Sequence, residues 1–410
     1  MRINSARLQA SLETMAQIGR TAGGGVTRLA LSDEDKAARD LLARWLAEAG
    51  LTVQVDDFGN MLARRPGSDP AAAPVRLGSH LDTVRQGGRF DGALGVLAAL
   101  EVVRTLNDAG AVTRRPIEIV NWTNEEGARF EPAMLGSGAA TGRFTKAFVY
   151  GRADREGRTF GDELVRIGYC GDPAQRPGPA HAYLELHIEQ GPVLEEAGVP
   201  VGVVEGIIGI TWCQVIVEGQ SAHAGTMPLA RRRDALQAAA HLVLAARELA
   251  RQAGPDARAT VGRFVVEPNV TNVIPGRVSF SVDFRHPEAA LLDRLVEQLH
   301  ARAEQVAAAE GVRISIERFW TSEPTPFDPA VKETIEAAVR ELGMPFQRLW
   351  SGAGHDAKYM QDCCPSGMIF VRSQGGLSHC EQEASTPEDI AAGANVLLAA
   401  TLRLAELVSR

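Results

Sequence analysis

The stretch Ile117-Glu-Ile-Val-Asn-Trp-Thr-Asn-Glu-Glu126 places a short apolar run directly before two adjacent carboxylates. The run 117–120 predicts a buried strand that ends in a polar loop. In an open α/β sheet, ligands bind in the crevice outside the carboxyl ends of the strands. One of the two carboxylates, Glu125 or Glu126, could therefore bind a metal ion while the other stays free as a base. Most such pairs are solvated surface charge, so this hypothesis requires metal ligands at the ends of other strands.

Three histidines occupy such positions, each at or just after the end of a predicted strand: His80, His187 and His379. Asp82 is expected to accept a hydrogen bond from the ring nitrogen of His80 that faces away from a metal, which would fix the tautomer of the ring. The alternation of residues 183–189 places His187 on the polar face of its strand. Taken alone, His187 would more often be a solvated residue than a ligand.

Asp91 directly precedes an apolar helical run, residues 92–105. Its ordinary interpretation is a helix N-cap, and capping would compete with metal binding. With Asp91 included, the candidate ligands come from separate strand-end loops, and they are His80, Asp91, Glu126, His187 and His379. Imidazoles combined with carboxylates suit zinc, and also manganese or cobalt.

Five ligands are more than one tetrahedral site needs, so we expect two divalent ions bridged by Asp91. His80 and His187 would hold one ion and Glu126 and His379 the other, or the exchanged assignment. Glu125 would then remain free as a general base towards water at the metal site.

The length of 410 residues indicates two domains. The second half of the chain contains β-like runs and two interleaved helices in a βαββαβ order, at 208–218, 231–253, 259–284, 287–309 and 312–319. This order is typical of a small sandwich of one sheet and two helices. We therefore expect an α/β fold. A catalytic domain with a mixed sheet flanked by helices would span 1–207 and 322–410, and an inserted α+β lid or dimerisation domain would span 208–321.

Composition argues against several other classes of protein. A net charge of −8 disfavours a nucleic-acid binder, and no run of about 20 apolar residues predicts a membrane span. The start, Met1-Arg-Ile-Asn, lacks the apolar core of a signal peptide. The five cysteines show no CxxC spacing, which favours reduced thiols in the cytoplasm. Cys380 is interpreted as a small filler residue because no paired base lies nearby in the sequence.

As a set, the motifs resemble the M20-type dinuclear metallohydrolases, and within them the hydantoinase/carbamoylase branch. The motifs span nearly the whole chain in order: His80-Leu-Asp-Thr-Val, Phe90-Asp-Gly, Thr123-Asn-Glu-Glu-Gly-Ala-Arg-Phe, Met134-Leu-Gly-Ser-Gly, His187-Ile-Glu-Gln-Gly-Pro, Ala222-His-Ala-Gly-Thr-Met-Pro, Gly354-His-Asp-Ala and Leu377-Ser-His. The branch is told from plain peptidases by His187, which stands where aminopeptidase relatives have an acidic ligand. Cys380-Glu-Gln-Glu departs from the pattern after His379, where relatives more often have Asn or Thr.

The resemblance implies further roles, residue by residue. His223 is similar to a histidine that stabilises the oxyanion and is often supplied by the lid of the partner subunit. Asn272 and Arg285 resemble binders of the substrate carboxylate, which an arginine can hold through two hydrogen bonds. Gln190 and Gly354 resemble further substrate contacts. His355 and Asp356 could be substrate contacts or structural hydrogen-bonding residues.

The expected activity is hydrolysis of the ureido C–N bond of an N-carbamoyl-L-amino acid by a homodimer with two divalent ions per subunit. The nearest alternatives are an allantoate amidohydrolase and a β-ureidopropionase. A dipeptidase or aminoacylase is more distant, and a non-enzymatic binding protein more distant still.

Overall fold

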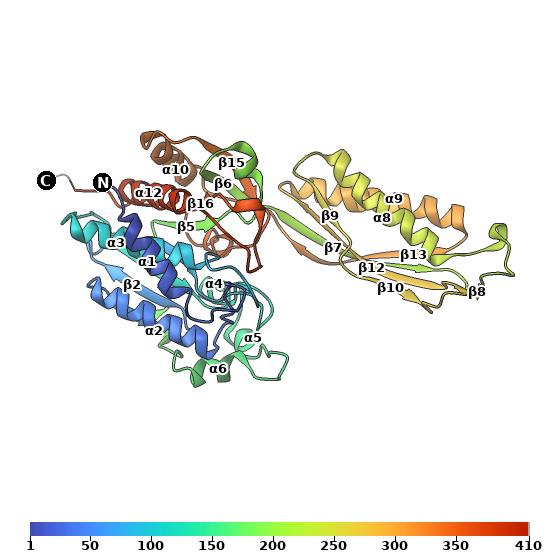
Figure 1. Cartoon of the computed structure of the whole chain (residues 1–410), viewed down its shortest axis with the longest axis horizontal. Coiled ribbons are helices and arrows are strands. Elements are labelled where there is room, and N and C mark those ends of the chain that lie inside the picture. The colour runs from blue at the N-terminus through green and yellow to red at the C-terminus, as the bar shows by residue number, and fades with distance from the viewer. Residues whose placement is uncertain (409–410) are drawn as a thin grey trace. The chain divides into compact units, whose positions relative to one another are not determined.

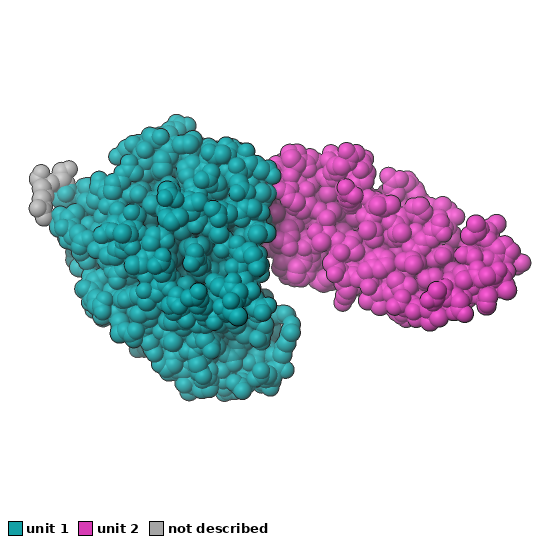
Figure 2. Space-filling view, in the orientation of Figure 1, with its two compact units in different colours: residues 1–206, 326–410 teal, residues 207–325 magenta. Residues whose placement is uncertain are grey.

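The computed structural model describes residues 1–408, which form two compact units. Among the described residues, unit 1 contains 1–206 and 326–408, and unit 2 contains 207–325 (Figure 2). The inserted unit of the structure begins at residue 207 and ends at residue 325, against an expected insertion of 208–321.

Unit 1 is built on a mixed sheet, as expected (Figure 1). Its strands lie in the order β1 (Thr52–Val55), β2 (Met61–Arg65), β4 (Ile117–Trp122), β3 (Val75–His80), β5 (Ala182–Ile188), β16 (Ser366–Val371), β6 (Val201–Ile207) and β14 (Thr325–Pro326), with β15 (Phe346–Ser351) paired to β6. The four central strands, β4, β3, β5 and β16, run parallel to one another. Strands β2 and β6 pair antiparallel on either side of them. The parallel strands are buried and apolar, and their carboxyl ends meet at one edge of the sheet.

Five longer helices pack around this sheet: α1 (Ser5–Met15), α2 (Asp33–Glu48), α3 (Ala93–Asp108), α10 (Pro329–Glu341) and α12 (Pro387–Leu404). Helix α3 is buried along nearly its whole length because it contacts β3 and β5 as well as α1 and α12. Five helices of four to seven residues complete the unit: α4 (Leu135–Ala140), α5 (Lys146–Tyr150), α6 (Phe160–Arg166), α7 (Val193–Ala197) and α11 (Ala357–Met360). Among the described helices, none combines the length and apolar composition that a membrane span needs.

Unit 2 has the expected βαββαβ order, except that the strand after its first helix is divided into two short strands, which pair with successive parts of the next long strand. Its elements are β7 (Gly209–Glu218), α8 (Ala235–Ala253), β9 (Arg258–Thr260), β10 (Phe264–Glu267), β12 (Arg277–His286), α9 (Ala289–Glu310) and β13 (Arg313–Ser322). The sheet order is β10-β12-β7-β13, with β9 on β12. Alternate residues such as Val215 and Phe280 form a core with α8 and α9, which lie on the same face of the sheet (Figure 1). Beyond one end of this sheet, β8 (Ala222–His223) and β11 (Val273–Ile274) form a separate two-stranded ribbon.

Candidate metal centre and active site

The predicted ligands of unit 1 converge because they leave the carboxyl ends of four neighbouring parallel strands. His80 is the last residue of β3, and His187 is the penultimate residue of β5. Glu126 follows β4 and His379 follows β16. Asp91 lies in the connection from β3 to α3. Ligand positions spread over 300 residues of sequence are thus brought to one edge of the sheet.

Asp91 lies at the centre of the cluster, between two groups of potential donors. Its Oδ1 is 3.1 Å from Nε2 of His187 and 3.7 Å from Nε2 of His80. Its Oδ2 is 3.4 Å from Nε2 of His379, which in turn is 3.5 Å from Oε2 of Glu126. The donor atoms of His80, Asp91 and His187, and those of Asp91, Glu126 and His379, lie within 4.8 Å of one another in each group. This is the grouping expected for two ions bridged by Asp91.

Both buried histidines present the same ring nitrogen to the cluster. Nδ1 of His80 lies 2.9 Å from the carbonyl oxygen of Asp82, and Nδ1 of His187 lies 2.9 Å from that of Ile188. A proton on each Nδ1 would satisfy these bonds and, with a metal ion bound, leave the Nε2 lone pair of each ring to the ion. Burial lowers the pKa of His80 to about 4, which keeps this ring neutral as a ligand must be.

The predicted role of the Asp82 side chain is wrong. The group that meets His80 is the backbone carbonyl of Asp82, whereas its carboxylate accepts the backbone N–H groups of Glu125 and Glu126, both at 3.2 Å. Asp82 therefore fixes the loop that carries the two glutamates. Its carboxylate oxygen Oδ1 lies 4.0 Å from Nδ1 of His80, too far for a hydrogen bond.

The expected competition at Asp91 does not arise. Helix α3 begins at Ala93, its N-cap residue is Gly92 with φ 65°, and no side chain caps it. This left-handed residue, which favours glycine, turns the chain so that the Asp91 side chain faces the histidines. A Cβ at Gly92 would lie 2.3 Å from the His80 ring, so a side chain there would collide with it.

Glu125 is buried beside the first group of donors. Its Oε2 lies 3.5 Å from Nε2 of His80. Burial raises the pKa of Glu125 well above its ordinary value, and the charges of Asp356 and Glu126 raise it further. A carboxylate with a raised pKa is suited to accept a proton and return it.

The polar face of β5 is buried, so the interpretation of His187 as a solvated residue is wrong. Tyr183, Glu185 and His187 are at most 1% exposed. Glu185 accepts hydrogen bonds from Ser79 Oγ at 2.7 Å and from the Ala357 N–H at 3.0 Å. The neighbouring strand β3 and the first residue of α11 therefore supply the hydrogen bonds that this buried face needs.

His355 and Asp356 belong to the same buried layer. The His355 ring lies 4.5 Å from that of His187, and its Nε2 is 3.0 Å from Ser351 Oγ. Asp356 forms a short hydrogen bond with Ser137. Both residues therefore form structural hydrogen bonds, and His355 also lines the cavity beside the cluster, so a substrate contact of these residues stays a prediction.

The cluster opens into a small cavity of about 130 Å³. It is lined by Asp91, Glu125, Glu126, Ala133, His187, Gln190, Ala353, Gly354, His355 and His379, a set without Lys or Arg. Gln190, predicted to contact substrate, donates from Nε2 to Asp91 Oδ2 at 3.0 Å. Gly354 lies on the wall, as a substrate contact would require. The substrate roles of both residues remain predictions.

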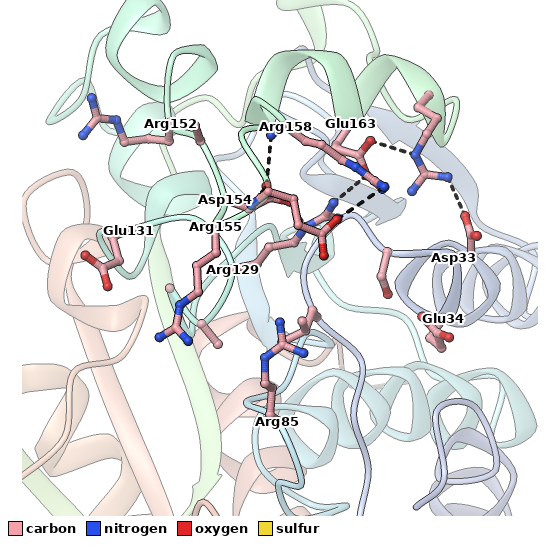
Figure 3. A pocket seen from close by; sticks show the side chains of 17 residues that line it. Asp33, Glu34, Arg85, Arg129, Glu131, Arg152, Asp154, Arg155, Arg158 and Glu163 are labelled. Atoms are coloured by element: carbon pink, nitrogen blue, oxygen red, sulfur yellow. Dashed lines mark hydrogen bonds and ion pairs between the residues drawn. The ribbon is translucent and has the colours of Figure 1, made fainter.

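A larger cavity of about 640 Å³ adjoins the loop that follows Glu126, but its charges largely neutralise one another (Figure 3). Arg129 donates to Asp154 at 3.1 Å, to Glu163 at 2.6 Å and to the carbonyl of Ala30 at 3.1 Å. Arg129 therefore fastens the loop that carries Glu125 and Glu126, here called the glutamate loop, to segment 152–166.

The predicted residues of unit 2 fall into two separate places within that unit. His223 and Asn272 lie together on the ribbon, where His223 pairs with Val273 and the Ala224 N–H donates to the Asn272 carbonyl. Nδ1 of His223 accepts the N–H of Gly225 at 3.0 Å, which leaves Nε2 to carry the proton. Arg285 lies on β12 opposite Ile210 and forms an ion pair with Asp283 at 2.9 Å.

The donor set of unit 1 fits divalent metal ions. Oε1 of Glu126 is buried and has no hydrogen-bond partner, an expensive arrangement unless a cation is bound nearby. Three carboxylates, Asp91, Glu125 and Glu126, share a cavity that no Lys or Arg side chain lines. Imidazole and carboxylate donors are those that zinc, manganese and cobalt accept.

Comparison with known proteins shows that the chain is similar to metal-dependent amidohydrolases. The family described as "Peptidase family M20/M25/M40" matches residues 76–403. The chain is 46% identical to an N-carbamoyl-L-amino-acid amidohydrolase of Rhizobium meliloti, covering 99% of this chain and 98% of the relative. It is 44% identical to a protein of the same name from Geobacillus stearothermophilus, covering 98% and 99%. An allantoate amidohydrolase of Bacillus subtilis (strain 168) is 34% identical, covering 96% of each.

A solved structure of an amidase has the same fold as this chain. An amidase of the hydantoinase/carbamoylase family from Burkholderia multivorans superimposes with a TM-score of 0.96 at 49% identity, covering 98% of each chain.

Proposed function

Because the chain belongs to the metal-dependent peptidase family M20/M25/M40, we propose that it hydrolyses the ureido C–N bond of N-carbamoyl-L-amino acids. The products are an amino acid, ammonia and carbon dioxide. The observation that carries the proposal is the Asp91-centred cluster with Glu125 beside it. The curated relatives of 44–46% identity carry this activity in their names.

His80, Asp91 and His187 would hold one divalent ion, and Asp91, Glu126 and His379 the other. We propose zinc first and manganese or cobalt as alternatives. Ions held there would act as Lewis acids, stabilising negative charge on oxygen and making water more acidic.

Glu125 is the proposed general base and acid. It takes a proton from the attacking water and returns it to the leaving nitrogen. The N–H on Nε2 of His223 donates to the oxygen on which negative charge develops. Glu125 keeps its position for both proton transfers because the carboxylate of Asp82 holds its backbone N–H.

The size and lining of the cavity support the proposal that residues of unit 2 complete the site. A volume of 130 Å³ is the space of about four water molecules, enough for a carbamoyl group but not for a whole ureido acid. Its lining offers no cation for the substrate carboxylate. Arg285 and Asn272 would bind that carboxylate, with Arg285 oriented by Asp283.

The layout of unit 2 favours a homodimer with shared sites. On β12, Arg277 pairs with Glu218 at the end that leads to the ribbon, and Arg285 pairs with Ile210 at the other end. Eight residues of extended strand separate them by about 27 Å. A small ureido acid cannot bridge that distance, so Arg285 of one subunit and His223 and Asn272 of the other would serve one substrate.

The five cysteines are unpaired in this structure, which fits a proposed cytoplasmic location.

Two assays test the proposal. A panel of N-carbamoyl-L-amino acids, allantoate, N-acetyl-amino acids and dipeptides should show the highest kcat/KM for the carbamoyl compounds. A higher value for allantoate would identify the alternative activity instead. Glu125→Gln should keep bound metal and lose nearly all turnover, and a near-normal rate would remove Glu125 from its role.

Shared sites are tested by mixing two inactive variants. Glu125→Gln and His223→Ala subunits, dissociated and reassociated together, should regain about a quarter of the wild-type activity, because half of the dimers hold one intact site of two. No recovery, together with monomers that are fully active, would contradict the shared site.

A further inference from the structure

Glu383 is a buried carboxylate to which the reaction gives no role. It is 4% exposed and lies four residues after His379 in the sequence. Its Oε1 accepts the backbone N–H groups of Phe90 and Asp91, both at 3.1 Å. Its Oε2 accepts the hydroxyl of Ser378 at 2.9 Å. One side chain thus joins the loop that carries Asp91 to the loop that carries His379.

The loop that carries His379 needs a contact that fixes its position. His379 has φ 55°, a left-handed conformation that a non-glycine residue adopts only at a cost in free energy. Its side chain is half exposed, so packing contributes little to its position. The neighbouring Ser378 hydroxyl accepts from Gln190 Nε2 at 3.1 Å and donates to Glu383, which fixes the residue before His379.

The loop that carries Asp91 leaves room for the Glu383 carboxylate. A Cβ built on Gly88 would lie 1.9 Å from Cδ of Glu383, so only glycine lets the chain pass this close. The N–H groups of two successive residues, Phe90 and Asp91, then point at one oxygen. Together with the Ser378 hydroxyl, these donors hold both oxygens of the Glu383 carboxyl group.

We propose that Glu383 is a positioning residue that sets the separation of Asp91 and His379, and thereby the metal affinity of the Asp91–Glu126–His379 group. This inference rests on the proposed dinuclear function. Glu383 itself faces backbone N–H groups and a hydroxyl, so it is not a ligand. Partners that orient ligands typically contribute 10- to 100-fold to metal affinity.

The test is a metal titration that needs no substrate. Metal-free full-length protein is titrated with Zn²⁺ against a chromophoric chelator, and bound zinc per chain is measured after dialysis. Wild type should bind two ions. Glu383→Ala should bind the ion of the Asp91–Glu126–His379 group about 10- to 100-fold more weakly and the other ion with a smaller change, and we expect His379→Ala to weaken the same ion. Glu383→Gln, which keeps an oxygen for the two N–H groups, should fall between.

Two further variants keep the result interpretable. Glu381→Gln is the matched control, because Glu381 lies in the same segment but bonds to Thr21, and both ions should bind normally. Gly88→Ala displaces the Glu383 carboxylate without removing it and should reproduce the selective loss even if Glu383→Ala does not fold.

Normal binding of both ions by folded Glu383→Ala or Gly88→Ala would overturn this inference alone. An equal weakening of both ions would also overturn it, because the effect would then be general. A wild type that binds no divalent ion would overturn the proposed function as well.

Discussion

Replacing Asp82 by asparagine isolates the support of the glutamate loop. Oδ1 of Asp82 accepts the Glu125 N–H and Oδ2 accepts the Glu126 N–H, each at 3.2 Å. Asparagine has one oxygen and one NH₂ group, so one of these two N–H groups would face a donor. Leaving a buried N–H unpaired costs about 1–3 kcal/mol. If the loop shifts to relieve this cost, Glu125 leaves its position.

We therefore expect Asp82→Asn to lower kcat by about 10- to 100-fold, since each 1.36 kcal/mol is a factor of ten in rate. KM should change less, because Asp82 does not line the cavity. The assay is steady-state hydrolysis of an N-carbamoyl-L-amino acid, with bound metal and the free energy of unfolding measured on the same samples.

The matched control is Asp328→Asn at the start of α10. Asp328 also accepts two successive backbone N–H groups, but both meet its Oδ1, at 2.9 and 3.1 Å, so asparagine can keep them. This variant should retain kcat. An Asp82→Asn enzyme with wild-type kcat would refute the reasoning, and so would an equal loss in the control.

Three further outcomes are expected. The ring of Trp212 contacts that of Trp320, with centroids 4.4 Å apart and a tilt of 39°, and Trp212 lies diagonally across from Arg285 on the sheet. Trp212→Ala should therefore lower kcat/KM for N-carbamoyl-phenylalanine about tenfold relative to N-carbamoyl-alanine, and an unchanged ratio would contradict this placement. Dialysis against a chelator should abolish activity, and added zinc, manganese or cobalt should restore it; full activity at zero measured metal would contradict the centre. Burial raises the pKa of Asp56 from 3.8 to about 6, so the stabilising contribution of its protonated form is present below pH 4 and lost as the pH rises through 6. Between pH 4 and pH 7, the free energy of unfolding of Asp56→Asn should therefore rise by about 3 kcal/mol relative to that of wild type. A difference that does not change with pH would contradict this.

The parts of the site that sequence could predict are those that follow from strand ends. Apolar runs before His80 and Glu125 fix where strands stop, and the carboxyl ends of parallel strands must lie at one edge. The βαββαβ order of unit 2 likewise follows from the periodicity of its apolar residues. Strand β12 buries every second residue, and helix α9 buries residues three or four apart along one face.

What sequence could not predict depends on the path of the backbone beyond those ends. A small change in the path of the loop after β3 decides whether the backbone carbonyl or the carboxylate of Asp82 contacts His80. The burial of Glu185 depends on residues near 355, far away in the sequence. Glu383 acts through backbone N–H groups, which no residue pattern displays. Strands β6 and β15 were not assigned from the sequence; β6 pairs with β16, β14 and β15, and β15 pairs with β6.

The sheet order also explains how the insertion can coexist with the metal site. In space, the strands that lead to the ligands follow one another as β4, β3, β5 and β16, spanning about 14 Å at 4.8 Å per strand. Imidazole and carboxylate side chains are long enough to converge over that width. The chain leaves for unit 2 at the end of β6 and returns at β14, which lie beyond β16 and outside the parallel set. The insertion is therefore joined to unit 1 outside the strands that carry the candidate ligands, which is compatible with the proposal that a second subunit completes the site.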